Sequence, residues 1–304
     1  MRVAAVVVAW NGGEALERCV ASLRGQGVYR LILVDNASHP AERERLDKLY
    51  GGVDDIELKL LGDNHGFADG ANIGMRAALD GGAEAVLVAT QDIVAEPDAV
   101  RQLLSALREH DAGVAGPLVL DANSGLELSR GERLWPALIC VPRTLLRYRG
   151  NAVRAYEVSG VMGCLMLIRA DCVRATEGFD AAFFAYYEEV DLCLRARAAG
   201  FRLLCVPAAR VTHDGMRGFL GGFTPLAAEL KGRNLVWLMR KHGTALRWAT
   251  FVPSYLLLLL GSAILYLARG RFDIVAALCR GAAAGSLQSP AAVPSPLGGR
   301  ADQA

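Results

Sequence analysis

Several common signatures are missing from this 304-residue chain. It has no CxxC pair, and its seven cysteines are scattered, most of them among apolar residues. This distribution argues against a disulfide framework or a zinc site and favours a reducing cytosol. The absence of a GxGxxG sequence argues against an NAD-type dinucleotide fold. The net charge is only +1, so nothing in the composition indicates nucleic acid as a partner.

An N-terminal leader of the secretory kind is also missing. Residues 3–8 form a short apolar run that follows a single arginine. This segment has neither the long apolar core nor the cleavage site of a signal peptide. We therefore expect the folded part to stay in the cytoplasm. The hydrophobic content of 53% is enough for a large core, in one large domain or in one domain with an appendage.

Strand-like and helix-like segments alternate through the first 110 residues. Apolar runs of strand length stand at residues 3–9, 31–34, 56–61 and 85–89, and amphipathic patterns between and after them predict helices at 14–23, 67–79 and 98–107. This order predicts an α/β fold with a largely parallel sheet and right-handed crossovers. In such sheets ligands bind beyond the carboxyl ends of the strands.

Polar residues follow the first two predicted strands. Trp10 and Asn11 come after the first, and Asp35 and Asn36 after the second. A buried aspartate at a strand end can accept a hydrogen bond from a base N–H or a ribose hydroxyl. The simpler alternative is an Asx-turn that only ends the strand.

An acidic cluster lies between an aromatic run and a helical pattern in residues 183–202. Glu188, Glu189 and Asp191 fall within four residues, and Gly200 supplies a helix stop. The acids would occupy the first helical turn, where the helix dipole favours negative charge. Capping alone would explain them, but the aromatic rim and a histidine some 20 residues further on, His213, favour a functional site.

The stretch FFAYYEEVDLCLRARAAGFRL closely resembles the acceptor-side motif of family 2 inverting glycosyltransferases, especially bacterial rhamnosyltransferase-like members. The resemblance covers roughly residues 3–240, with several motifs in the family's order. It implies a GT-A fold, Rossmann-like with a mostly parallel sheet flanked by helices, and a nucleotide-sugar donor. The family usually has Glu-Asp where this chain has Glu188-Glu189, and the second acid of that pair is its general base. Glu189 takes that role here, with one extra methylene, and Glu188 or Asp191 could contribute.

The same resemblance implies a donor site and a metal site. Residues 64–74 are similar to a family element rich in Asn and Gly, in which Asn64, Gly66 and Asn72 would lie at the donor, with Gln91 beside them. The family places Asp-x-Asp after the fourth strand to hold Mn²⁺ or Mg²⁺ against the diphosphate. Here the second acid is present as Asp92, and a threonine replaces the first.

Two further residues gain a role through the resemblance. His213 would join Asp92 on the metal, as a histidine at this place does in relatives; without the resemblance a structural histidine is the commoner case. Arg233, on a helix predicted from about residue 226, belongs to an Arg-Asn pair like that of relatives, and could contact the diphosphate. A place on the helix surface is the alternative.

The C-terminal part suggests a membrane. Residues 248–268 carry no charge and would span about 30 Å as a helix, with Trp248 and Tyr266 suited to the two interfaces and arginines on both flanks. We expect residues 241–285 to form a helical membrane-associated extension of the domain at 1–240, and residues 286–304 a disordered tail. A single crossing, helices lying in the interface, and a soluble helix packed on the core remain open.

The expected function is metal-dependent, inverting transfer of a hexose, with rhamnose as the leading candidate, from a dTDP- or UDP-linked donor to a glycan or lipid-linked acceptor of the cell envelope. The expected place is the cytoplasmic face of the bacterial inner membrane. Two alternatives stay open: a degenerate relative that binds nucleotide-sugar or acts as a scaffold, and a sugar nucleotidyltransferase. The latter needs a basic, Gly-rich loop after the first strand, and residues 10–13 contain no Lys or Arg.

Overall fold

The structure, a computed structural model, describes residues 1–134, 140–142, 154–214 and 224–288. The strands are β1 (Val3–Ala9), β2 (Val28–Asp35), β3 (Ile56–Leu60), β4 (Ala85–Thr90), β5 (Ile93–Ala95), β6 (Val114–Asp121), β7 (Glu127–Ser129), β8 (Glu132–Leu134), β9 (Cys140–Pro142), β10 (Tyr156–Glu157), β11 (Leu165–Arg169) and β12 (Leu203–His213). The helices are α1 (Gly13–Leu23), α2 (Pro40–Tyr50), α3 (Gly66–Asp80), α4 (Ala99–Glu109), α5 (Ala170–Thr176), the 3₁₀ turn η1 (Ala181–Phe183), α6 (Glu188–Ala198), α8 (Pro225–His242), α9 (Ala245–Ala268) and α10 (Phe272–Leu287).

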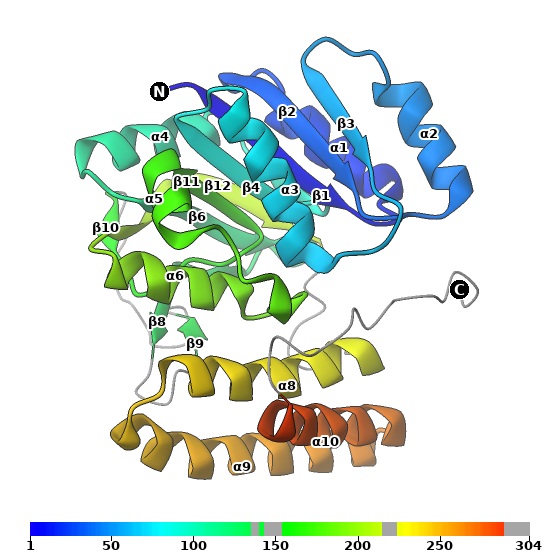
Figure 1. Cartoon of the computed structure of the whole chain (residues 1–304), viewed down its shortest axis with the longest axis vertical. Helices are drawn as coiled ribbons and strands as arrows, with labels where there is room; N and C mark the ends of the chain where they lie inside the picture. Colours follow the sequence, from blue (N-terminus) through cyan, green and yellow to red (C-terminus); the bar gives the residue numbers. More distant parts are fainter. Residues whose placement is uncertain (135–139, 143–153, 215–223, 289–304) are drawn as a thin grey trace.

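The main sheet has the order β10-β12-β6-β11-β4-β1-β2-β3, with β5 beside β12 and β7 beside β6 (Figure 1). The strands of the first half, β4, β1, β2 and β3, are all parallel, as expected for strands joined by helices. The second half is mixed: β11 runs antiparallel to both β4 and β6, while β12 is parallel to β6. The sheet is therefore parallel where the nucleotide site was predicted and mixed beyond it.

Both faces of the sheet are covered. Alternate residues of β1 enter two different cores, with Val7 in one and Val6 in the other. Helices α1, α2 and α4 contribute side chains to the first core, and α3, α5 and α6 to the second. This coverage explains why β1 is apolar at every position and buried throughout.

The helices and strands match the predicted alternation, with boundaries moved by a few residues. The acidic helix is confirmed: α6 begins at Glu188, has all three acids in its first turn, and ends just before Gly200, which has φ +89°. Helix α2 was not predicted because its sequence, PAERERLDKLY, buries only Leu46 and Tyr50. Pro117 does not break β6; instead the neighbouring β12 shifts register between Val206 and Arg210.

Helices α8, α9 and α10 form a further layer below α6 (Figure 1). Helix α8 lies between α6 and the other two, and its apolar side chains join those of η1, α6 and α9 in a third core. Glycines allow α8 and α10 to approach closely: a Cβ on Gly281 would lie 2.1 Å from the carbonyl oxygen of Glu229, and one on Gly285 2.6 Å from that of Arg233. The predicted domain boundary at residue 240 falls inside α8 and stays a prediction.

Helix α9 includes the uncharged segment predicted at 248–268. It is long and apolar enough to cross a membrane, and 22% of its most apolar window is buried inside the protein. The residues of the predicted tail beyond 288 lie outside the described part of the chain.

Candidate functional site

The carboxyl ends of β4, β1 and β2 lie side by side, and the polar residues that follow them meet there. The amide of Gln91 accepts a hydrogen bond from the Trp10 N–H (2.7 Å) and donates one to the Trp10 carbonyl (3.1 Å). The Asn11 N–H donates to the Ser38 hydroxyl (2.7 Å). The register that pairs Ala9 with Asp35 sets these neighbours. We call residues 10–11, 35–36, 64–66 and 90–92 the donor rim.

Asp35 is the most buried carboxylate of the donor rim. Its side chain is inaccessible to solvent, one oxygen (Oδ2) accepts a bond from the Ser38 N–H (3.2 Å), and the other (Oδ1) has no hydrogen-bond partner in the described structure. Burial raises the pKa of Asp35, opposed by the hydrogen bonds of Ser38 and the charge of Arg43. A buried oxygen without a partner is an unusual feature that a ligand N–H or hydroxyl would satisfy.

Asn36 and Asn64 shape the turn that leads into α3. The Asn36 amide donates to the Asn64 side chain (3.0 Å) and to the Gly66 carbonyl (2.9 Å), and accepts from the His65 N–H (2.9 Å). Gly66 has φ +74°, and a Cβ there would lie 2.4 Å from the Phe184 carbonyl oxygen. Only glycine fits this contact without strain. The turn thus joins the donor rim to the aromatic run before α6.

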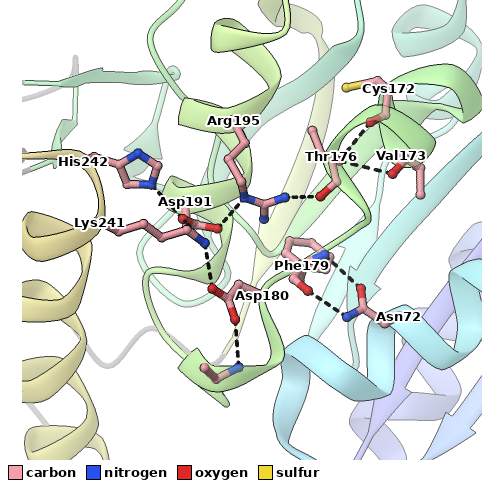
Figure 2. Close-up of polar contacts among 11 residues, drawn as sticks. Asn72, Cys172, Val173, Thr176, Phe179, Asp180, Asp191, Arg195, Lys241 and His242 are labelled. Carbon is pink, nitrogen blue, oxygen red and sulfur yellow. Dashed lines mark hydrogen bonds and ion pairs between the residues drawn. The ribbon is translucent and has the colours of Figure 1, made fainter. Parts of the chain in front are cut away.

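Asn72 uses its side chain differently. Its amide donates to the Phe179 carbonyl and accepts from the Phe179 N–H, both at 2.8 Å (Figure 2). The structure thus fixes the Asn72 side chain against Phe179, in the segment between α5 and η1. A role for Asn72 in donor binding stays a prediction.

Asp92 and His213, 121 positions apart in the chain, meet at the end of the donor rim. One oxygen of Asp92 (Oδ1) lies 3.1 Å from His213 Nε2 and accepts a hydrogen bond from the Thr90 hydroxyl at 2.6 Å. Burial of Asp92 opposes its ionisation, but the His213 contact and the Thr90 bond outweigh burial, so the pKa of Asp92 falls below its usual value. His213 Nδ1 is buried and has no hydrogen-bond partner among the described residues.

This pair fits a divalent cation. An ionised carboxylate and an imidazole supply two ligands, and a cation of the Mn²⁺ or Mg²⁺ type takes its remaining ligands from diphosphate oxygens and water. Among the residues that the structure describes, no three His, Cys, Asp or Glu side chains form a group that would hold a metal by itself.

Residues 184–191, which we call the acid rim, lie at the start of α6. Glu188 is buried, and one of its oxygens (Oε2) has no hydrogen-bond partner in the described structure. Glu189 is half-buried and packs on Gly163, where a Cβ would lie 3.0 Å from its own Cβ. Burial raises the pKa of Glu189, while backbone hydrogen bonds and the charge of Lys231 lower it. Burial and the neighbouring Glu189 charge raise the pKa of Glu188 further.

The side chain of Asp191 points toward the C-terminal end of α8. It is inaccessible to solvent and contacts Arg195 Nε (2.7 Å), His242 Nε2 (2.7 Å) and Lys241 Nζ (2.9 Å) (Figure 2). Burial opposes ionisation, but these three partners together lower the pKa of Asp191. Its carboxylate therefore ties α6 to α8.

Arg233 is buried in α8 rather than on the helix surface. Its guanidinium donates to the Asn234 side chain (2.9 Å) and to the Phe183 carbonyl (3.1 Å), and lies 4.2 Å from the ring centre of Trp237. These contacts place it beneath the acid rim. A contact between Arg233 and a diphosphate stays a prediction.

Two further charged residues near Glu189 were not predicted. Glu132 is buried in β8, accepts a hydrogen bond from the Ser129 hydroxyl (2.8 Å), and has a pKa raised to about 7 by burial, with a smaller contribution from the Glu189 charge. Lys231 lies 4.6 Å from the ring centre of Tyr186, and burial lowers its pKa to about 8. Glu132 lies in a stretch of weak periodicity, which carried no signal. Lys231 stands two positions before the predicted Arg233.

Comparison with known proteins identifies the family. A model described as glycosyltransferase like family 2 matches residues 1–228. The chain therefore belongs to glycosyltransferase family 2. The family resemblance inferred from residues 183–203 is therefore confirmed. The prediction that the protein is a glycosyltransferase is confirmed too, because that activity defines the family.

Relatives of this family 2 member include two named transferases. An N-acetylglucosaminyl-diphospho-decaprenol L-rhamnosyltransferase of Mycobacterium tuberculosis is 30% identical over 68% of this chain and 74% of its own length. The low-salt glycan biosynthesis hexosyltransferase Agl10 of Haloferax volcanii is 25% identical over 63% of this chain, and the match spans 60% of the length of that protein.

The fold has neighbours among solved structures. The crystal structure of GalNAc-T7 with UDP, GalNAc and Mn²⁺ superposes with a TM-score of 0.61 at 16% identity, over 79% of this chain and 48% of the other. At this identity the likeness shows the fold, and it confirms the prediction of a GT-A glycosyltransferase fold.

Proposed function

We propose that this chain transfers a hexose, with rhamnose the leading candidate, from a dTDP- or UDP-linked donor to a hydroxyl of a cell-envelope glycan or lipid-linked acceptor. The observation that carries the proposal is the contact between Asp92 and His213 at the strand ends of a family 2 fold. The rhamnosyltransferase relative supports the choice of sugar. The names of the two relatives, a glycan hexosyltransferase and a diphospho-decaprenol rhamnosyltransferase, support the acceptor class.

The donor rim supplies the nucleotide site in this proposal. The unpartnered oxygen of Asp35 accepts a base N–H or a ribose hydroxyl. Trp10, which is exposed, follows Ala9, the residue of β1 that pairs with Asp35. Asp92 and His213 hold Mn²⁺ or Mg²⁺ at the diphosphate. When bound, such an ion offsets the negative charge that builds on the leaving group.

Glu189 is the general base. The acceptor oxygen attacks the anomeric carbon, its proton passes to the Glu189 carboxylate, and the bond from that carbon to the diphosphate oxygen breaks in the same step. A displacement from the far side inverts the anomeric centre. A base works best when its pKa lies near the operating pH, and the raised pKa of Glu189 moves it in that direction. The charge of Lys231 works against full protonation.

The protein is proposed to lie on the cytoplasmic face of the cell membrane through α9. One side of α9 packs inward through Phe251, Tyr255 and Tyr266. The other side exposes a set of large apolar side chains: Leu246, Val252, Leu256, Leu257, Leu260, Ile264 and Leu267. Because one face is already covered by protein, this arrangement favours a helix that lies along the membrane surface over one that crosses it.

A second candidate is a degenerate relative that binds nucleotide-sugar without transferring it. The observation in its favour is a double departure from the family motifs, Thr90 for the first metal-binding acid and Glu189 for an aspartate. Glutamate extends the base by one methylene, and a misplacement of about 1 Å can cost about 10²-fold in rate.

Isothermal titration of the full chain with UDP and dTDP, with and without Mn²⁺, tests the donor site. We expect one nucleotide to bind only with metal, and Asp92→Ala and His213→Ala to lose that binding. Asp55→Ala, which removes an exposed carboxylate just before β3 at the opposite end of the sheet, is the matched control. Failure of both nucleotides to bind in the presence of metal would overturn the donor-site assignment.

A transfer assay then separates the enzyme from the degenerate relative. Supplied with dTDP-rhamnose or a UDP-hexose and a polyprenyl-diphosphate glycan, the enzyme releases nucleoside diphosphate and forms a product of inverted configuration. Metal-dependent nucleotide binding without turnover on any such donor would favour the degenerate relative.

A further inference from the structure

The backbone just before α6 is strained. Phe184, Tyr186 and Tyr187 have φ values of +65°, +69° and +71°, in a region that residues with a side chain rarely adopt. Such conformations persist only where the surrounding structure holds them, and they gather at functional sites. All three lie within the four residues before Glu188. The conformation of this turn therefore sets the direction in which the first turn of α6 presents its acids.

The side chain of Asn234 holds this turn. Asn234 is inaccessible to solvent, and its amide nitrogen lies 2.8 Å from each of three carbonyl oxygens, those of Phe183, Ala185 and Tyr186. An amide NH₂ is a donor that can face several carbonyl oxygens, whereas a carboxylate has no donor to offer them. The contacts of Asn234 thus reach three of the five residues from 183 to 187.

Asn234 is itself fixed in place. Its amide oxygen accepts a hydrogen bond from Arg233 Nε at 2.9 Å, which orients the amide with its nitrogen toward the turn. Arg233 also donates to the Phe183 carbonyl and stacks on Trp237, and the Trp237 ring meets Phe183 edge-on with 6.4 Å between ring centres. The hydrogen bonds of Arg233 and Asn234 and the aromatic contact of Trp237 thus all come from α8 and act on the start of the turn at residues 183–187.

Helix α8 contacts α6 at a second point. Lys241 and His242, about two turns beyond Asn234, hold Asp191. The Asp191 N–H in turn bonds to the Tyr187 carbonyl (3.0 Å), which links the strained turn to the first turn of α6. Helix α8 therefore contacts the acid rim twice, at the turn before α6 through Asn234 and at Asp191 through Lys241 and His242. Helix α10 packs against α8 through its glycines.

We propose that Asn234 is a positioning residue for Glu189, acting by holding residues 183–187 in the strained conformation that aims the base. This inference rests on the proposed role of Glu189 as general base. Asn234 itself touches neither donor nor acceptor in this scheme. Asn234 acts on Glu189 only indirectly, through the backbone of residues 183–187.

The first test measures the turn directly, without any activity. Hydrogen–deuterium exchange of the full chain is followed in peptides that cover residues 183–190. Asn234→Asp keeps the size of the side chain but places a carboxylate oxygen against the three carbonyls, so we expect exchange there to rise by about 10-fold or more. Leu278→Ala, in the α8–α10 contact, is the control for general loosening and should leave these peptides within about twofold of the wild type.

The second test is a double-mutant cycle on turnover. Asn234→Asp should lower kcat by about 10²-fold and leave the donor KM within about twofold, since only the base moves. In a Glu189→Gln background the same substitution should change kcat by less than about threefold, because the group that it positions is gone. Equal losses in both backgrounds would overturn the proposal and indicate general damage.

The two tests separate failure of the inference from failure of the proposed function. Unchanged exchange at 183–190 in Asn234→Asp overturns the inference whatever the activity. Faster exchange together with full activity of Glu189→Gln shows that Asn234 holds the turn but that Glu189 is not the base, which overturns the proposed mechanism and the positioning role derived from it.

Discussion

The donor rim and the acid rim are built in different ways. Each polar residue of the donor rim except those of the 64–66 turn stands at the carboxyl end of a strand or within two residues after it, and the parallel register of β4, β1 and β2 brings them together. The acid rim depends on contacts from α8, more than 40 positions later in the chain, and on a strained backbone. The first rim is a consequence of local sequence and sheet geometry, and the second of long-range packing. Substitutions should therefore affect ligand binding at the first rim and catalysis or stability at the second.

The largest effect is expected at the base. Glu189→Gln removes the proton acceptor without changing its size, and we expect kcat to fall by about 10³-fold while nucleotide affinity stays within about twofold. Steady-state kinetics and titration calorimetry measure the two quantities. Glu177→Gln, an exposed glutamate, serves as the control. A comparable loss of nucleotide affinity in Glu189→Gln would contradict the separation of the two rims.

Breaking the contact between α6 and α8 should lower stability. Asp191→Asn leaves Arg195, Lys241 and His242 without their carboxylate, and we expect a loss of about 3 kcal/mol in the free energy of unfolding at pH 7. Because the pKa of Asp191 is lowered in the folded state, its contribution is present above the unfolded pKa and is lost as the pH falls through the folded value. Urea unfolding at pH 7 and near pH 3 should show the difference shrinking.

The exposed pair of Asp171 with Arg169 is the matched control for that experiment. Asp171→Asn should cost about 0.5 kcal/mol or less, because exposed ion pairs contribute little. If both substitutions cost the same, Asp191 does not tie the two helices together.

Glu132 should make the folded protein less stable as the pH rises. Its pKa is about 7 in the folded protein against 4.5 for the free side chain, so the unfolded state gives up the proton first. Stability should fall between these two pH values, by up to about 3 kcal/mol, and Glu132→Gln should remove most of that fall. Unfolding free energies at pH 4.5 and pH 8 test this. Glu127→Gln, an exposed neighbour, should leave the pH dependence in place.

The smallest effect concerns the donor rim. Thr90 stands where the family has an acid, and its hydroxyl bonds to Asp92. Thr90→Val removes that bond, and we expect Mn²⁺-dependent nucleotide affinity to fall by about 10-fold, as is typical when a ligand loses its orienting partner. Thr90→Ser keeps the hydroxyl and should bind as the wild type does. A Thr90→Val variant that binds normally would show that Asp92 needs no orientation from this side.

Most of the fold was predictable because its signals are local. Runs of apolar residues of strand length, separated by amphipathic helices, predicted β1 to β4, α1, α3 and α4, and the acids in the first turn of α6 were predicted from their spacing. The apolar strand that ends near residue 168 was predicted as well, but its antiparallel direction as β11 was not, because a strand buried on both faces has the same apolar pattern in either direction. Helix α2, with few buried residues, had too weak an amphipathic pattern to be recognised.

The site was predictable to a similar extent. The sequence by itself determined which residues follow the strands, that three acids begin one helix, and that the motifs match glycosyltransferase family 2. The resemblance predicted that His213 joins Asp92, and the structure brings the two side chains within 3.1 Å of each other. Only the tertiary structure decided that Glu132 lies near Glu189 and that Asn234 contacts the turn before α6. The physical reason is distance along the chain: periodicity and turn chemistry act over a few residues, whereas these contacts arise only once the sheet and α8 have packed.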